Sequence, residues 1–181
     1  MSKTPSVINK RADVLSKIEE LFSLLTNEDR VVANNLHQLA IEWDMKIGIG
    51  NIRSNVTNTK TNYDITYSAK KPSARSIFLI KINVIDDKPN ATFGVKPKLL
   101  NLDKYRPITE ECPDTIKNVI KNIKECKKCN AKCTQQVTFT LDGAFYNACT
   151  YGGEVFENLT ADEWDLLQNL TIEEYNAHAT V

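Results

Sequence analysis

The sequence contains few of the residues on which irregular proteins and many active sites depend. Its 181 residues include 2 histidines, 6 glycines and 6 prolines, while 41% are hydrophobic and 25% are charged. Low glycine and proline contents with ample apolar residues argue against collagen-like, low-complexity and disordered chains. A chain of this length and composition is typical of a globular protein with one domain.

No long apolar run occurs in the chain. The longest candidate, Ile77–Ile80, is interrupted by Lys81, whereas a helix that spans a bilayer needs about 18–20 apolar residues. The stretch from Met1 to Ser6 also lacks the apolar region of a signal peptide. We therefore expect a soluble protein without membrane contact that resides in the cytoplasm, where clustered cysteines more often bind metal than form structural disulfides.

An excess of charge of one sign is missing as well. Lysine and arginine total 23, aspartate and glutamate total 23, and the formal net charge is zero. Nucleic-acid-binding domains usually carry a basic excess, so this balance disfavours nucleic acid as the partner. The expected partner is a small molecule or another protein, and the sequence identifies neither of them.

The two histidines match no catalytic pattern. His37 lies in the middle of a predicted helix, beside its apolar side, and His178 lies in a tail that is predicted to be frayed. Neither is adjacent to a plausible nucleophile, as Cys-His and Ser-His-Asp machinery would require. The run Gly48–Asn51 also lacks the third glycine of a dinucleotide-binding loop. We therefore expect a protein that is not an enzyme.

The pattern of apolar residues predicts an α+β protein. Apolar positions recur every three or four residues from 6 to 25 and again after Thr26, which predicts two antiparallel helices. Residues 50–62 are polar and predict a loop. Strands are predicted over 63–67, 76–84 and 91–96, which gives a three-stranded antiparallel sheet packed against helices.

The C-terminal part carries its own helix signals. Pro113 suits the first position of a helix, whose apolar stripe leads directly into Cys126. Thr160 and Glu163 match a capping box at the start of a terminal helix. The expected buried face of that helix consists of Trp164, Leu167, Leu170 and Tyr175. We thus expect residues 1–112 to form the helical hairpin and sheet and residues 113–181 to form a helix, a four-cysteine hairpin and the terminal helix, all in one compact unit.

The dipeptide Asp142-Gly143 predicts a two-residue hairpin turn between strands 137–141 and 144–149. With that turn, Gln136 lies opposite Cys149, and Cys149 lies on one face of the hairpin. The opposite face is expected to be apolar and to pack on the core; it consists of Val137, Phe139, Leu141, Ala144, Tyr146 and Ala148.

Four of the five cysteines are predicted to act together: Cys126, Cys129, Cys133 and Cys149. The first three follow the pattern C-x2-C-x3-C, and the hairpin turn brings the fourth back to them. Zinc prefers four tetrahedral thiolate or imidazole ligands, and a two-residue spacer lets two sulfurs reach one ion. Because the protein would fill all four positions, the expected cofactor is a structural Zn²⁺ that staples the hairpin.

Several alternatives remain open from the residues alone. In one alternative the cysteines are unconnected thiols, and in another they are ligands of an iron–sulfur cluster. In a third, Cys126 and Cys129 form a redox-sensing pair. Another alternative is a regulatory protein that binds nucleic acid through the lysines around the cysteines, Lys124, Lys127, Lys128 and Lys132. Cys112, the fifth cysteine, lies among acidic residues that raise a thiol pKa and is expected to be incidental.

The segment from Cys126 to Glu163 combines three clustered cysteines, the run Asp142–Tyr146, Cys149 and the run Phe156–Thr160. In these features it resembles the C-terminal region of many small, uncharacterised bacterial proteins. The preceding helices and sheet are similar in outline to the small α+β domains grouped as domain of unknown function 1801. The resemblance implies an α+β fold and cysteines that act together, and it implies no activity.

Overall fold

The computed structural model describes residues 6–53, 60–70, 75–86, 88, 90–127, 136–149 and 154–179. These residues form an α+β protein that divides into two compact units. Unit 1 comprises Met1–Tyr67 and Ile80–Phe93, and unit 2 comprises Ser68–Leu79 and Gly94–Val181. The units therefore alternate along the chain, and neither of them ends at residue 112.

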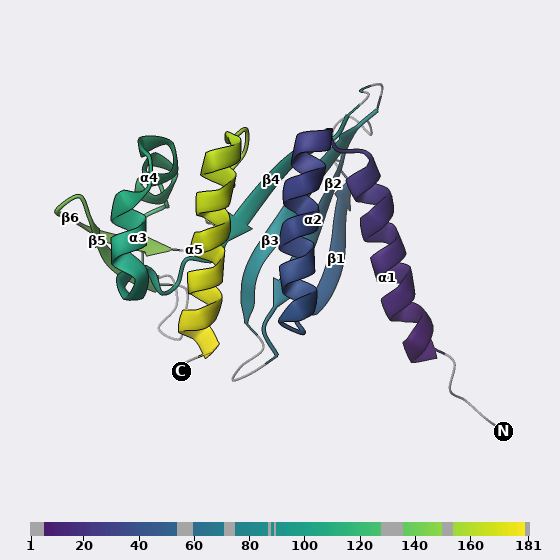
Figure 1. Ribbon diagram of the computed structural model, residues 1–181, viewed down its shortest axis with the longest axis horizontal. Helices are drawn as coiled ribbons and strands as arrows, with labels where there is room; N and C mark the ends of the chain where they lie inside the picture. Colours follow the sequence, from purple (N-terminus) through teal and green to yellow (C-terminus); the bar gives the residue numbers. More distant parts are fainter. Residues whose placement is uncertain are drawn as a thin grey trace. The chain divides into compact units, whose positions relative to one another are not determined.

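The helices and strands of the described residues follow one another in a simple order (Figure 1). They are α1 Ser6–Ser23, α2 Asn27–Glu42, β1 Lys46–Arg53, β2 Lys60–Ser68, β3 Ser76–Ile85, β4 Thr92–Pro97, the 3-10 helix η1 Leu102–Tyr105, α3 Arg106–Glu111, α4 Asp114–Lys121, β5 Gln136–Leu141, β6 Ala144–Cys149 and α5 Ala161–Ala179. Strands β1–β4 form an antiparallel sheet in sequence order, and β5 and β6 form a separate pair.

The two predicted helices at the start of unit 1 are confirmed. They run in opposite directions (Figure 1). Thr26 caps α2, since its Oγ1 accepts a hydrogen bond from the Asp29 N–H at 3.1 Å. Arg30 then closes the end of α1, because its guanidinium donates to the carbonyl oxygens of Phe22, Ser23 and Leu25. The apolar stripes predicted from the sequence supply buried residues on both helices, among them Ile18, Leu21, Phe22, Ala33, Leu36 and Ala40.

The sheet has four strands where the sequence predicted three. The loop predicted over 50–62 is wrong for residues 50–53 and 60–62, which belong to β1 and β2, while residues 54–59 lie outside the described part. In β1 the half-buried Ile47 and Ile49 alternate with the exposed Gly48 and Gly50. This period of two is a strand signal, and it was obscured by the glycines, which usually weaken strands.

His37 connects α2 to β2 inside unit 1. Its Nδ1 lies 2.9 Å from the hydroxyl oxygen of Tyr67, whose side chain is fully buried. The imidazole also meets the rings of Phe22 and Tyr67 edge-on, with centroids 5.9 and 5.8 Å away. The sequence placed His37 beside the helix seam; the structure gives it a specific partner across the helix–sheet contact.

In unit 2 a buried carboxylate ties α5 to the segment around η1. Glu174 is 1% exposed and accepts three hydrogen bonds, from the backbone N–H and side-chain amide of Asn101 and from the hydroxyl of Tyr105, at 3.0, 2.9 and 2.7 Å. No described lysine or arginine forms an ion pair with Glu174. Three donors thus replace the water that this carboxylate would lose on burial.

The terminal helix is longer at its C-terminal end than the sequence suggested. The predicted capping box is confirmed, since the Thr160 N–H donates to Glu163 Oε2 at 2.8 Å. The predicted tail at His178 is wrong: this residue lies in α5 and is 4% exposed. The buried stripe is Trp164, Leu167, Leu170, Thr171, Glu174 and His178, whereas Tyr175 is only half-buried.

A close backbone crossing fixes the part of β4 that belongs to unit 2. Val95 and Phe156 exchange backbone hydrogen bonds of 3.0 and 2.8 Å. A Cβ at the preceding Gly94 would lie 2.5 Å from Val155 Cγ1 and 2.8 Å from Glu157 Cγ. Glycine is therefore required there by the close approach of the two segments.

We expect the stability of unit 1 to fall on acidification through His37. Burial lowers the pKa of His37 below its ordinary value, with Glu19 acting weakly in the opposite direction. The unfolded chain then takes up a proton at a pH at which the folded protein does not, so acidification below about pH 6.5 favours unfolding. Urea unfolding of the wild type and of His37→Gln at a series of pH values measures this. The free energy of unfolding of the wild type should exceed that of His37→Gln by less as the pH falls. A difference between the two proteins that does not change with pH would contradict the role of His37.

Replacing Glu174 by glutamine should destabilise unit 2 by about 1–3 kcal/mol. The substitution turns an acceptor oxygen into an amide that faces hydrogen-bond donors. The half-buried neighbour Glu173 provides the matched control, and Glu173→Gln should change the free energy of unfolding by less than about 0.5 kcal/mol. Equal unfolding midpoints in urea for the two variants would show that the Glu174 hydrogen bonds contribute no net stability.

Candidate functional site

The hairpin at the candidate site has the register that the sequence predicted. Gln136 pairs with Cys149, Val137 with Ala148, and the pairing continues to the turn without a bulge. Asp142 and Gly143 form the turn with φ angles of 49° and 78°. Both values lie in the left-handed region that a two-residue turn of this twist requires.

Two lysines of α4 hold this turn. Lys117 Nζ and Lys121 Nζ lie 2.9 and 2.7 Å from the two carboxylate oxygens of Asp142. The hydrogen bond from Lys121, followed by that from Lys117, lowers the pKa of the Asp142 carboxyl below its usual range. The pairs are exposed to solvent and therefore contribute orientation more than stability.

The apolar face of the hairpin is confirmed in part. Val137, Phe139, Leu141 and Ala148 are buried, whereas Ala144 is exposed and Tyr146 half-buried. Tyr146 stacks on Phe139 with the ring centroids 5.1 Å apart and the planes 9° from parallel. The face therefore packs at its β5 side and leaves part of β6 accessible.

A third extended segment lies beside β6. The Cys126 N–H donates to the Asn147 oxygen at 3.0 Å, and the Cys149 N–H donates to the Lys124 oxygen at 2.8 Å. The bonds surround an antiparallel bridge between Glu125 and Ala148. The prediction that a helix continues into Cys126 is wrong: α4 ends at Lys121, and residues 124–126 are extended. Pairing with β6 gives hydrogen-bond partners to the backbone N–H and C=O groups of this segment. In a further turn of helix, the last carbonyl groups would have lacked partners within the helix.

This pairing places Cys126 and Cys149 on the same face of adjacent strands. Each flanks the Glu125–Ala148 bridge, so the two cysteines occupy diagonal positions, whose Cα atoms are separated by about 7–8 Å in antiparallel sheets. Cys126 is 7% exposed and Cys149 is half-buried. Among the predicted zinc ligands, the structure thus brings together the two that are farthest apart in the sequence.

The other two predicted ligands, Cys129 and Cys133, lie outside the described residues, as do Lys128 and Lys132. Within the described ranges, no group of three or more histidine, cysteine or acidic side chains could hold a metal ion. Cys112 is a separate, buried thiol that donates to the Ile108 oxygen at 3.3 Å. Burial raises its pKa, with Glu111 adding to the effect and Lys117 opposing it.

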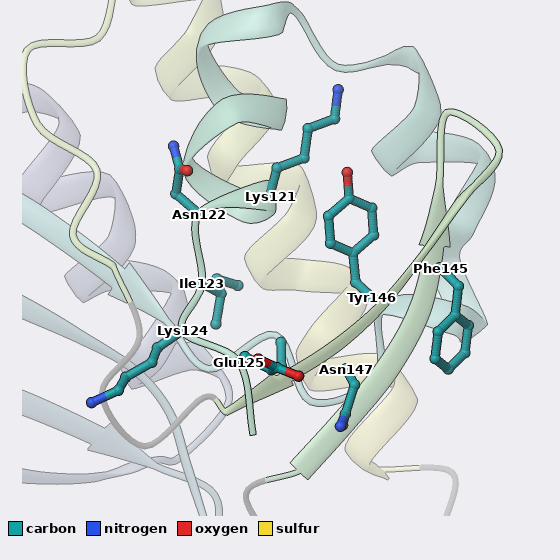
Figure 2. A pocket seen from close by; sticks show the side chains of 9 residues that line it. Lys121, Asn122, Ile123, Lys124, Glu125, Phe145, Tyr146 and Asn147 are labelled. Atoms are coloured by element: carbon teal, nitrogen blue, oxygen red, sulfur yellow. The ribbon is translucent and has the colours of Figure 1, made fainter. Parts of the chain in front are cut away.

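A groove of about 590 Å³ opens beside the Cys126 segment. Residues Lys121–Glu125 line one side, and Phe145–Ala148 of β6 line the other (Figure 2). Phe145 is 72% exposed, a large apolar side chain on the face of the hairpin that alternation assigns to polar residues. That mismatch is the sequence signal for the groove, and the prediction of the hairpin from the sequence did not use it.

Comparisons with protein-family models, with curated proteins and with solved structures found no match for this chain. The resemblance to small bacterial proteins and to domain of unknown function 1801 stays a prediction. In the described part of the chain, no helix has the length and apolar character that crossing a membrane demands.

Replacing Gly143 by alanine should destabilise the hairpin by about 1–2 kcal/mol, because an L-residue at this positive φ is strained. Gly48→Ala is the control: its added Cβ meets nothing within 4 Å, and its φ is not in the left-handed region. Chemical denaturation of both variants measures the difference. A Gly143→Ala protein as stable as the control would mean that the turn does not need its left-handed conformation.

Proposed function

We propose that the chain is a non-enzymatic binding or interaction module whose C-terminal hairpin is held by one structural zinc ion. The ligands are Cys126, Cys129, Cys133 and Cys149. The observation that supports this most directly is the shared face of Cys126 and Cys149 on adjacent antiparallel segments. A sequence separation of 23 residues is thereby reduced to neighbouring positions without any contribution from the metal.

The diagonal placement of Cys126 and Cys149 is compatible with a thiolate site. Zn–S bonds of about 2.3 Å in a tetrahedron keep the sulfurs about 3.8 Å apart. Side chains from diagonal positions can converge on such a point by rotation about their Cα–Cβ bonds. Asn147, opposite Cys126, has its side chain engaged by β5, since its Oδ1 accepts a hydrogen bond from Gln136 Nε2 at 3.1 Å.

The spacing of the remaining cysteines fits the same point. Cys129 follows Cys126 by three residues, and Cys133 precedes Gln136, the partner of Cys149, by three residues. Three extended residues span at most about 10 Å, a length of chain that is compatible with all four thiols binding one ion.

A closed set of four thiolates leaves no position for a reactive water, which supports a structural rather than a catalytic role for the zinc. The exposed Lys124 and Lys127 offset part of the negative charge of the tetrathiolate. The redox alternative receives less support, because Cys126 is 7% exposed and oxidants need access to a thiolate.

Protein purified without chelators should contain one zinc ion per chain by elemental analysis. Cys149→Ser should abolish stoichiometric zinc binding. Its melting temperature should be lower than that of the untreated wild type and equal to that of chelator-treated wild type, because metal binding stabilises only the folded state. Cys112→Ala is the matched control, since this thiol lies outside the proposed ligand set, and it should keep the metal.

Two outcomes would contradict the zinc site. One is a metal-free wild-type protein whose melting temperature is insensitive to chelator. The other is full zinc occupancy in Cys149→Ser, which would leave the hairpin unconnected to the metal. Iron in place of zinc, with visible absorbance, would instead identify the iron–sulfur alternative.

A further inference from the structure

We propose that the groove between Lys121–Glu125 and Phe145–Ala148 binds a nucleotide, either free or as part of a single strand. The ligand class is a planar base that carries a phosphate. The groove lies within the range of about 300–1,000 Å³ that is typical of ligand sites. The site contains none of the cysteines, so it does not depend on the zinc proposal.

The first element is an open strand edge. In an antiparallel strand, the N–H and C=O of alternate residues point to the same side. The backbone groups of Asn147 and Cys149 point toward residues 124–126. Phe145 is two residues before Asn147, so its N–H and C=O point to the same side of β6, into the groove. No described residue bonds to these two groups. A donor and an acceptor side by side complement the edge of an unpaired base.

The second element is an exposed aromatic surface. Phe145 has its side chain 72% exposed. Figure 2 shows its ring on the outer side of β6, with Tyr146 on the side of the groove that faces Lys121. Bases stack on such rings with little dependence on sequence. An apolar side chain left in water at the rim of a polar groove gains by being covered with a flat ligand.

The third element is local positive charge. Lys124 lines the groove and is exposed. Figure 2 shows its side chain pointing away from β6, and the ammonium group forms no ion pair or hydrogen bond with a described residue. Lys121 lines the same groove, although it is shared with Asp142. The charged residues that line the groove are thus two lysines and one acidic residue, Glu125. A further lysine, Lys127, lies two residues after Glu125 in the sequence. The zero net charge of the whole chain hides this local excess, which is sufficient for a phosphate and modest for a long strand.

The test uses the full chain at low salt with two probes: adenosine monophosphate, followed by amide NMR, and a short labelled oligo(deoxyadenylate), followed by fluorescence anisotropy. Both should bind, and the Phe145 amide resonance should shift on titration. Phe145→Ala should weaken binding by about tenfold through lost stacking. Lys124→Glu should weaken it by about fivefold and reduce its dependence on salt.

Matched controls come from unit 1. Val31, with a side chain 59% exposed, is the control for Phe145, and the exposed Lys46 is the control for Lys124. Val31→Ala and Lys46→Glu should bind both probes as the wild type does. Because Phe145 and Lys124 are exposed, their variants are expected to fold, and the NMR shift in the wild type tests the site without any variant.

The outcomes separate the two sources of the ligand. Equal affinity for the monophosphate and the oligomer identifies a free nucleotide, whereas a much tighter oligomer identifies a single strand. Absence of binding by both probes, an unmoved Phe145 amide, or equal losses in the control variants would overturn the proposal. Zinc content, measured on the same samples, tests the metal proposal independently.

Discussion

The C-terminal unit depends on one short backbone pairing, that of residues 124–126 with β6. Two hydrogen bonds, from Cys126 to Asn147 and from Cys149 to Lys124, turn a two-stranded hairpin into a three-stranded arrangement. An isolated hairpin is marginal in water, so the added segment and the helices packed against β5 supply what the hairpin lacks. The same pairing brings two cysteines to one face and opens the groove where the segment leaves β6.

Local chemistry was sufficient to predict some elements from the sequence. The register of β5 and β6 followed from the Asp142-Gly143 turn and from alternation, because a one-residue slip would have exchanged the two faces of the strands. The start of α5 followed from the reciprocal hydrogen bonds of Thr160 and Glu163. In both cases the residues that determine the structure are within a few positions of one another.

The remaining features depend on contacts between residues that are distant in the chain. The segment 124–126 looks like the end of a helix until β6 offers its edge. Glu174 looks like an exposed residue of a terminal helix until Asn101 and Tyr105 are placed beside it. For the candidate site, the sequence predicted the diagonal approach of Cys126 and Cys149 only in outline, and it did not reveal the exposed Phe145 as part of a groove.

The alternation of the two units along the chain has a consequence for biosynthesis. Unit 1 takes its final strand residues from Ile80–Phe93, and unit 2 begins earlier, at Ser68. Neither unit can be released by a single proteolytic cut, and neither is complete when the segment before Ser68 leaves the ribosome. Unit 1 therefore includes residues on both sides of the Ser68–Leu79 segment of unit 2, and a truncation at residue 112 would remove most of unit 2 while keeping every residue of unit 1.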